Sequence, residues 1–417
     1  MFSDRTNWRL AQNRLTAAIE VARMQGGAIL DLTVSNPTRV GLVYDSSAIL
    51  GALSSSRAMD YDPQAKGLLS AREAVAGYYG NLDPERIVLT TSTSEGYSFV
   101  FRLLCNAGDE LLVPKPSYPL FEFLADLQDV KLVPYPLIYD HGWQMDFPSL
   151  EKAVTEQTRG VVVVHPNNPT GSFVSAGEME LLNEFCREHG LAVIADEVFL
   201  DYGLDVGTAS EGSAAEEPET NSRSLHAPVD RHSPIHRLGR DDSAALSFAF
   251  NSDVLTFTLS GVSKISALPQ MKVAWVVTSG PADEVAAAMA RLEVIADTYL
   301  SMNAPVQWAV PALLEQRKSI QRQLMERVRA NLAELDRQLA LQRDCSRLNV
   351  QGGWYAVLRV PVTRSDEELA IELVREKRVL VHPGHFYDFP GDGYLVLSLI
   401  GAEGEFKEGV QRILDAV

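Results

Sequence analysis

In the stretch VLTFTLSGVSKISALPQMKVAWVVTS, residues 254–279, two apolar, β-branched runs flank a polar turn that contains Lys264. Strand, turn and strand in this order predict a hairpin-like element buried in a larger sheet. A lysine between two buried strands is costly unless it is paired or reacts. Desolvation lowers the pKa of such an amine and makes it a nucleophile toward an aldehyde. The alternative is a solvated lysine in a turn. Motifs elsewhere in the chain distinguish these two interpretations of Lys264.

Two other apolar runs also end in polar side chains. VVVVHPNNPTG, residues 161–171, ends at a turn that carries Asn168, and LAVIADEVFLDY, residues 191–202, continues into Asp196 and Glu197. Continuous apolar strands separated by helices indicate an α/β fold with a parallel sheet. Ligands of such sheets bind at the carboxyl ends of the strands, so these polar groups are expected to lie together with Lys264.

A turn rich in hydroxyl groups follows a third strand. IVLTTSTSEGYSFVFRLL, residues 87–104, predicts strand, turn and helix, with five hydroxyl residues at 90–94. Backbone N–H groups and the helix dipole make this helix start an anion site suited to phosphate. Simple N-capping requires one hydroxyl, so the excess favours a ligand. Tyr118, in a Pro-bounded loop after the strand near 109–115, is either a core residue or a platform for a ring.

Composition and charge exclude several classes of protein. With 417 residues, 46% hydrophobic and 22% charged, the chain is long enough for two domains of an ordinary globular protein. A net charge of −18 argues against nucleic-acid binding. Three widely spaced cysteines argue against a disulfide framework or a zinc site, and we expect no metal. We find no signal-peptide core and no membrane-spanning run, so a cytoplasmic location is expected.

The chain divides into three parts. Residues 1–45 are predicted to be an N-terminal segment that joins a small domain, 46–300 a large domain, and 301–417 the C-terminal small domain. Residues 204–245 are rich in Ser, Glu, Pro, Asp and His, and we interpret them as a mobile insertion whose histidines are solvated. Helices are expected near residues 4–24 and 304–341.

The order of these motifs resembles a known family. An apolar strand followed by NNPTG, a second followed by Asp-Glu, then Ser-Lys with a cation eight residues later, is similar to the fold type I pyridoxal-phosphate enzymes of the class I/II aminotransferases, which are aspartate aminotransferase-like. The resemblance runs from about residue 30 to the C-terminus. It implies a three-layer α/β sandwich with a mainly parallel central sheet, plus a smaller α+β domain.

The resemblance also implies a cofactor, pyridoxal 5′-phosphate, and a role for each matching residue. Lys264 matches the lysine that forms the Schiff base and shuttles the proton, and Asp196 matches the carboxylate that pairs with the pyridine nitrogen. Asn168 matches the asparagine that bonds the 3′-oxygen, and Tyr118 matches the aromatic residue that stacks on the ring. The matches for the phosphate ligands are Thr93, Ser94, Ser263 and Lys272, together with Tyr61, which would reach the phosphate from the partner subunit. The implied enzyme is a homodimer with shared sites that moves an amino group from an amino acid to a 2-oxo acid by a ping-pong mechanism.

Three positions depart from the family pattern. Lys272 stands in place of an arginine and lacks its bidentate fork. Phe199 stands where a tyrosine usually bonds the 3′-oxygen, so one donor is missing. In GYLVLSLI, residues 393–400, Val396 takes the place of the arginine that binds the substrate α-carboxylate. We hypothesise that Arg39, in the turn Asn36-Pro37-Thr38-Arg39, substitutes for it.

Alternatives remain open at this point. Arg39 is otherwise a solvated loop residue, and Trp354 either borders the substrate pocket or is a core aromatic. Loss of the carboxylate anchor also fits another reaction at Cα or Cβ, catalysed by a decarboxylase, lyase or racemase. A cofactor-binding regulatory or structural protein is a third hypothesis, against which stands the intact Lys264.

Overall fold

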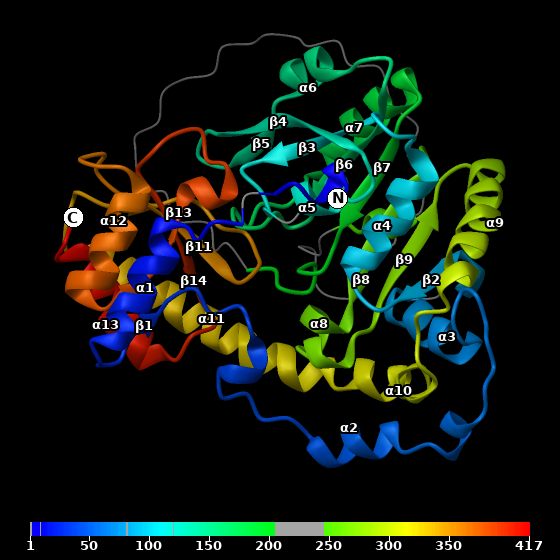
Figure 1. Cartoon of the computed structure of the whole chain (residues 1–417), viewed down its shortest axis with the longest axis horizontal. Helices are drawn as coiled ribbons and strands as arrows, with labels where there is room; N and C mark the ends of the chain where they lie inside the picture. Colours follow the sequence, from blue (N-terminus) through cyan, green and yellow to red (C-terminus); the bar gives the residue numbers. More distant parts are fainter. Residues whose placement is uncertain (1, 9, 81, 120, 205–245) are drawn as a thin grey trace, which may run out of the picture.

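The computed structural model describes the whole chain except residues 1, 9, 81, 120 and 205–245, so the predicted insertion at 204–245, apart from its first residue, lies outside the described residues. The described chain forms a large sheet flanked by helices and a smaller sheet with its own helices (Figure 1). This arrangement confirms the predicted three-layer α/β sandwich with a smaller α+β part. In the described part, no helix combines the length and the apolar character needed to cross a bilayer.

The large sheet is mainly parallel. Its described strands follow the order β2 (Ile87–Thr90), β9 (Ala274–Ser279), β8 (Thr256–Gly261), β7 (Ala192–Asp196), β6 (Thr158–Val164), β3 (Glu110–Lys115), β4 (Lys131–Tyr139) and β5 (Trp143–Met145). The pairings from β8 through β7, β6 and β3 to β4 are parallel. Strands β8 and β9 pair antiparallel, which confirms the predicted hairpin around Lys264.

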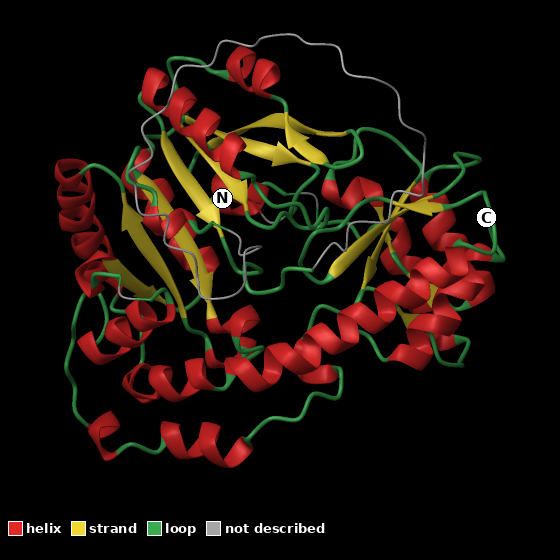
Figure 2. Ribbon diagram, turned by 180° about the vertical axis from the view of Figure 1, so that it is seen from behind, coloured by secondary structure: helices red, strands yellow, loops and turns green. Residues whose placement is uncertain are grey.

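Helices cover both faces of the large sheet. The helices of the described chain are α1 (Arg14–Met24), α2 (Ser46–Leu53), α3 (Leu69–Tyr78), α4 (Thr93–Leu104), α5 (Phe121–Asp126), α6 (Phe147–Ala153), α7 (Ala176–His189), α8 (Val262–Ile265), α9 (Ala282–Tyr299), α10 (Ala304–Glu315), α11 (Arg317–Leu339), α12 (Asp366–Glu372) and α13 (Glu403–Leu414). On one face, Phe257 and Val276 pack against α4 and α9. On the other, Val193 packs with α6 and α7, and Trp275 packs with α3 and α10. Figure 2 shows the helices in red around the yellow strands of the sheet.

The small sheet is antiparallel. Its order is β10 (Ser346–Arg347), β11 (Tyr355–Arg359), β14 (Tyr394–Ser398) and β13 (His382–Pro383). A short parallel pair, β1 (Leu30–Asp31) and β12 (Val379–Leu380), lies beside it. The consecutive helices α10 and α11 run from the large domain to this region, as predicted for residues 304–341 (Figure 1).

The N-terminal segment packs with the C-terminal residues. Leu15 and Leu32 share one apolar core with Leu395 and Phe406. The predicted first helix is wrong in its start, because Asp4–Thr6 form an isolated 3₁₀ turn. Helix α1 begins only after Asn13, whose side-chain oxygen accepts a hydrogen bond from the Thr16 N–H at 2.7 Å. The Asn13 side chain thus caps the helix, while Trp8, which the prediction placed on the apolar face of the helix, packs against Phe123 with ring centroids 5.4 Å apart.

Candidate active site

Lys264 lies in the short helix α8, directly after β8. The backbone approaches β9 so closely here that a Cβ at Gly261 would lie 2.8 Å from the Val273 carbonyl oxygen. Glycine is therefore required for the chain to leave the strand at this point. The buried Tyr202 fixes the next turn, because its hydroxyl donates to the Lys264 carbonyl oxygen at 2.6 Å. The reactive side chain thus stands on a rigid support.

The amine of Lys264 sits between two aromatic rings. Its Nζ lies 5.6 Å from the ring centroid of Phe199 and 5.1 Å from that of Trp354. Burial lowers the pKa of Lys264 to about 8, although the nearby carboxylate of Asp196 acts in the opposite direction. Roughly a tenth of the amine is therefore neutral at pH 7, far more than for a solvated lysine. This is the state that a nucleophile requires.

Asp196 ends β7 and faces the lysine. Its Oδ2 accepts from the Tyr97 hydroxyl at 3.0 Å, and its Oδ1 accepts from the Val198 N–H at 3.1 Å. Burial raises the pKa of Asp196 to about 6, while these two hydrogen bonds and Lys264 hold it down. The carboxylate is therefore ionised at neutral pH inside a buried site, where it can stabilise a cationic partner.

The neighbouring Glu197 has a different environment. The Ser247 hydroxyl bonds its Oε2 at 2.7 Å, and the Phe248 N–H donates to its Oε1 at 2.6 Å. Burial raises the pKa of Glu197 to about 8, so this carboxyl is mostly protonated at pH 7. It joins β7 to the segment before β8 and is a structural acid. Of the two carboxylates predicted at this strand end, Asp196 is the one whose charge reaches Lys264.

In the hydroxyl-rich turn, some side chains form hydrogen bonds that stabilise the start of α4, whereas others have no described partner. The Ser92 side chain caps α4 by accepting from the Glu95 N–H at 3.2 Å, and Thr91 donates from its backbone and its hydroxyl to the Glu95 carboxylate. Neither the Thr93 nor the Ser94 hydroxyl bonds a described residue. The helix start therefore presents two unused hydroxyls, at the positions predicted for a phosphate.

Two further predicted phosphate ligands flank α8. Ser263 is partly buried within α8, and its hydroxyl bonds no described residue. Lys272 is exposed at the end of the 3₁₀ turn Pro269–Met271, has a φ of 53°, and forms no ion pair with a described residue. Tyr61 lies in the loop before α3, with 83% of its surface exposed. All three groups are available for a ligand.

Adjacent asparagines in the NNPTG turn have different roles. Asn167 Nδ2 donates to the Pro116 carbonyl oxygen at 3.0 Å and to Thr170 Oγ1 at 2.8 Å, so this amide holds two loops together. The Oδ1 of Asn168 is buried without a partner among the described residues. Tyr118 is 42% exposed and packs edge-on against Phe121 at 6.2 Å. The Asn168 amide oxygen is thus free of described partners, and Tyr118 lies near Asp196, because burial and then the Asp196 charge raise the pKa of Tyr118.

The small domain contributes an aromatic wall. Trp354 is fully buried, with its ring 5.1 Å from those of Phe199 and Tyr202, and its Nε1 has no partner among the described residues. Tyr355 lies next to it, with its ring 6.4 Å from that of Phe199. Trp354 is therefore a core residue by burial and a neighbour of the lysine amine by distance.

The residues predicted to bind substrate from the N-terminal segment lie at the surface. Asn36 Oδ1 accepts from the Thr38 N–H and hydroxyl, at 3.0 and 2.7 Å, and thereby closes the turn. Arg39 is exposed and forms no ion pair with a described residue. Val396 is 1% exposed in the middle of β14.

Sequence reasoning missed Tyr97, His382 and Tyr387. Tyr97 follows Ser94 by three residues on the same helix, and this spacing could have placed it beside the strand ends. Nothing in the sequence places His382 near Val396, because their proximity comes from strand pairing.

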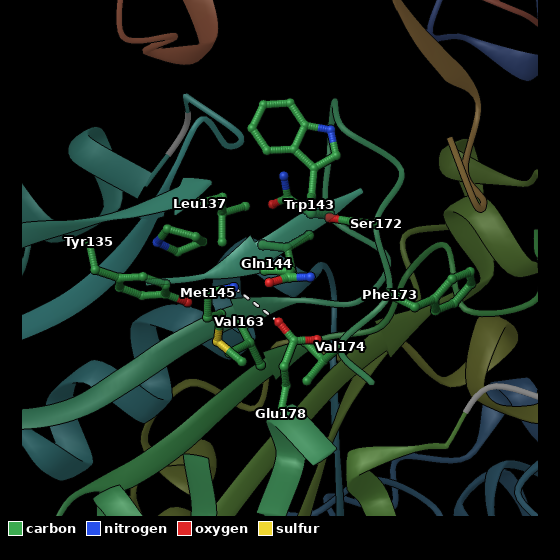
Figure 3. A pocket seen from close by; sticks show the side chains of 13 residues that line it. Tyr135, Leu137, Trp143, Gln144, Met145, Val163, Ser172, Phe173, Val174 and Glu178 are labelled. Atoms are coloured by element: carbon green, nitrogen blue, oxygen red, sulfur yellow. Dashed lines mark hydrogen bonds between the residues drawn. The ribbon is translucent and has the colours of Figure 1, made fainter. Parts of the chain in front are cut away.

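A separate hollow lies beside β4 and β5 (Figure 3). It has a volume of about 320 Å³, open to solvent, and its lining includes Tyr135, Trp143, Phe173 and Glu178. The Met145 N–H donates to Glu178 Oε1 across it at 3.0 Å. Since Lys264 and Asp196 are absent from its lining, we do not assign the chemistry to it. Among the described residues, no group of His, Cys, Asp and Glu is arranged to hold a metal ion.

The chain is similar to known proteins in sequence and in fold. The model of the family described as aminotransferase class I and II matches residues 45–413. The glutamate-pyruvate aminotransferase AlaA of Escherichia coli is 25% identical over 388 residues, which cover 90% of this chain and 87% of that protein. An S-alkyl-thiohydroximate lyase of Arabidopsis thaliana is 27% identical over 275 residues, covering 64% and 52%. The alanine aminotransferase of Pyrococcus furiosus has a similar fold, with a TM-score of 0.79, 20% identity and coverage of 99% and 98%.

Proposed function

The chain belongs to the class I and II aminotransferases, and from this premise we propose that pyridoxal phosphate binds beside Lys264 and that an amino acid and a 2-oxo acid exchange an amino group there. The chain is thus an enzyme of amino-group transfer, and members of its family depend on this cofactor. The proposal concerns which residues bind the cofactor and the substrates, and what each of them does.

Three features of the site fit pyridoxal phosphate. The buried Oδ1 of Asn168 lacks a partner, which leaves this amide free for a ring oxygen. Thr93 and Ser94 offer unused hydroxyls at the start of a helix of 12 residues, where an anion is stabilised. Asp196 is a buried carboxylate kept ionised by two hydrogen bonds, as a protonated ring nitrogen requires.

Each part of the cofactor has a proposed set of ligands. Lys264 would bind the aldehyde carbon, Asp196 the ring nitrogen, Asn168 the ring oxygen and Tyr118 the ring face. The phosphate ligands would be Thr93, Ser94, Ser263, Lys272 and Tyr61 of the partner subunit. When bound, the cofactor supplies an aldehyde carbon that takes up amines and a ring that accepts electron density from Cα.

The residues of the chain supply the proton transfers and the orientation. With the cofactor bound, the Lys264 Nζ would hold its aldehyde carbon when no substrate is present and would act as the general base toward the substrate Cα proton when substrate is bound. A pKa of about 8 suits this role, because the amine can accept and return a proton near neutral pH. The rings of Phe199 and Trp354 flank the amine and restrict the water that reaches it. The two half-reactions follow a ping-pong order.

The observation that carries this function is the buried Lys264 amine, with its pKa of about 8, facing the buried carboxylate of Asp196. Purified protein is expected to show an absorbance band near the visible edge when the cofactor is bound to Lys264. Borohydride should remove that band and leave a modified peptide that contains Lys264. If added pyridoxal phosphate produces no such band and no modified peptide, the proposal is wrong.

The amino donors are proposed from the relatives. The name of the relative AlaA, a glutamate-pyruvate aminotransferase, supports glutamate and pyruvate as the first pair to test, and alanine as the reverse donor. The experiment mixes the holoenzyme with one amino acid and no acceptor. An aminotransferase releases one 2-oxo acid for each site and then stops, because the amino group stays on the enzyme.

A second candidate function is a lyase at Cα or Cβ. The buried Val396 leaves the usual carboxylate position apolar, and one relative is named a lyase. A lyase would release ammonia or a side-chain fragment through many turnovers without a 2-oxo acid acceptor. The single-turnover experiment therefore distinguishes the two candidates.

Arg39 is proposed as a substrate anchor, together with Asn36 and Trp354. Its guanidinium is exposed and has no described ion-pair partner, so it is available for a carboxylate. The variant Arg39→Ala should raise KM for the amino acid by roughly tenfold and leave the cofactor absorbance intact. An unchanged KM would exclude this role.

The homodimer and the cytoplasmic location are also proposals. An 83% exposed tyrosine, Tyr61, borders a surface hollow of about 510 Å³, and a second subunit could cover it. Sedimentation should give twice the mass of the chain, and Tyr61→Phe should weaken cofactor retention without changing that mass. The three free cysteines, Cys105, Cys186 and Cys345, are compatible with a reducing compartment.

A further inference from the structure

A pair of neutral polar side chains lies beside Val396 on the small-domain sheet. In the pairing of β13 with β14, His382 is directly opposite Val396. Residues directly opposite each other in an antiparallel pair point to the same face of the sheet. The His382 Nδ1 is 2.9 Å from the Tyr387 hydroxyl oxygen. An imidazole and a phenol are thus joined next to the position where the chain carries no arginine.

This face of the sheet looks toward the reactive lysine. Tyr355 lies on the same face as Val396, because it pairs with Ser398, which follows Val396 by two residues on β14. The Tyr355 ring lies 6.4 Å from that of Phe199, which in turn lies 5.6 Å from the Lys264 amine. The other face carries the fully buried Leu358, Leu395 and Leu397, which pack in the core with α11 and α13.

The loop that carries Tyr387 is tied to the large domain. The Ser117 N–H donates to the Tyr387 carbonyl oxygen at 3.0 Å, directly before Tyr118. Lys115 and Asp388 form an ion pair at 2.8 Å across the same junction. The segment that carries His382 and Tyr387 is therefore held against the loop that carries Tyr118.

The hydrogen bond also sets the tautomer of His382. Burial raises the pKa of Tyr387, so its phenol keeps the proton that it can donate to Nδ1, and we take this as the direction of the bond. The proton of the neutral imidazole is then on Nε2, which bonds no described residue. Since His382 is partly exposed while Val396 is 1% exposed, the imidazole can be reached by a substrate that cannot reach the valine.

We propose that His382, held by Tyr387, binds the carboxylate of the amino acid substrate through its Nε2–H, in place of the missing arginine. This inference rests on the proposed function for the place of the reacting amine. A neutral donor avoids burying a second cation in the site, where desolvation would be costly. Burial lowers the pKa of His382 and so favours the neutral imidazole, although the Asp31 carboxylate acts in the opposite direction.

The test separates the carboxylate from the amine of the substrate. L-alanine and ethylamine share the reacting amine, and propionate carries the carboxylate alone. His382→Phe keeps an aromatic ring without donors, and His382→Gln restores an N–H. The exposed His385, three residues further on, gives the matched control His385→Ala.

His382→Phe should raise KM for L-alanine, and the dissociation constant of propionate, by roughly tenfold to a hundredfold. The rate with ethylamine and the cofactor absorbance should stay unchanged, and His382→Gln should recover most of the loss. Equal losses with alanine and ethylamine, or no loss with either, would overturn the assignment. If the wild-type protein binds propionate through His382 but transfers no amino group, the proposed function fails while the carboxylate site stands.

Discussion

The large sheet and the small sheet carry different kinds of side chain beside the candidate active site. The large domain presents charge, because Lys264 and Asp196 both stand at buried strand ends and influence each other's pKa. The small domain presents Val396, which is apolar, flanked by the neutral pair of His382 and Tyr387. Binding of the cofactor would therefore depend on the opposite charges of Lys264 and Asp196. Binding of the substrate carboxylate would depend on the neutral donors His382 and Tyr387.

The difference has a physical reason. A buried ion persists where the fold supplies partners, and Asp196 receives two hydrogen bonds at 3.0 and 3.1 Å. No such partners surround Val396, whose neighbours across the sheet are Val357 and His382. A family can therefore keep its cofactor chemistry constant while the binding of the substrate carboxylate changes. Ranked by their expected effect on amino transfer, four substitutions test this contrast.

The largest effect is expected for Lys264→Ala. It removes both the nucleophile and the base, so turnover should fall by at least about four orders of magnitude. The exposed Lys318→Ala, which only breaks an ion pair with Glu315 at 3.1 Å, is the control. Steady-state release of 2-oxo acid measures both variants, and more than a hundredth of wild-type turnover in Lys264→Ala would contradict the assignment.

The next effect is expected for Asp196→Asn. The variant keeps the shape and the Val198 N–H contact but loses the charge that would hold a protonated ring nitrogen. Because a charge-assisted hydrogen bond contributes about 1.5–3 kcal/mol, kcat should fall by roughly ten- to a hundredfold. The neighbouring Glu197→Gln should stay within about twofold of wild type. Equal losses in both variants would mean that the two carboxyls do not differ in role.

A smaller effect is expected for Phe199→Tyr, because Phe199 lies between Lys264 of the large domain and Trp354 of the small domain. Phe199 contacts the lysine amine on one side and Trp354 on the other. A phenol hydroxyl would add a donor toward the ring oxygen of the cofactor and stabilise its anionic form. The pH midpoint of the cofactor absorbance should fall by about one unit. A spectroscopic pH titration measures this, and a rise in the midpoint would show that the hydroxyl points elsewhere.

Glu197→Gln is expected to change stability and to leave amino transfer near the wild-type rate. Glu197 has a folded-state pKa of about 8, against 4.5 when unfolded, so unfolding releases a proton between these values. The free energy of unfolding should therefore fall as pH rises toward 8 in the wild type. Denaturant titrations between pH 6.5 and 8 should show a flatter dependence for Glu197→Gln. The exposed Glu184→Gln on α7 is the control, and an unchanged slope in Glu197→Gln would contradict the assignment.

The fold and the candidate cofactor residues were accessible from the sequence for a specific reason. Each apolar strand ends at its own polar residue, so Asn168, Asp196 and Lys264 are marked locally by a run of β-branched residues. The parallel sheet then brings these ends to one edge. The start of the first helix was misplaced because Asp4 and Asn13 both carry capping side chains, and Asn13 is the one that caps α1.

The substrate side was not accessible in this way. The sequence showed that Val396 stands where the family has an arginine, but it offered only Arg39 as a substitute. His382 lies 14 residues before Val396, and the antiparallel register of β13 and β14 makes them neighbours. Register depends on turn geometry and on the packing of both faces, and neither is written in a local motif.

By itself, then, the sequence determined the α/β class, the lysine and the order of strand ends, because hydrophobic periodicity and turn residues act locally. Tertiary structure decided which of two adjacent carboxyls carries a charge. Asp196 receives the Tyr97 hydroxyl bond and faces Lys264, whereas Glu197 turns to Ser247 and holds a proton. Burial and partners set a pKa, and both arise only when distant segments pack together.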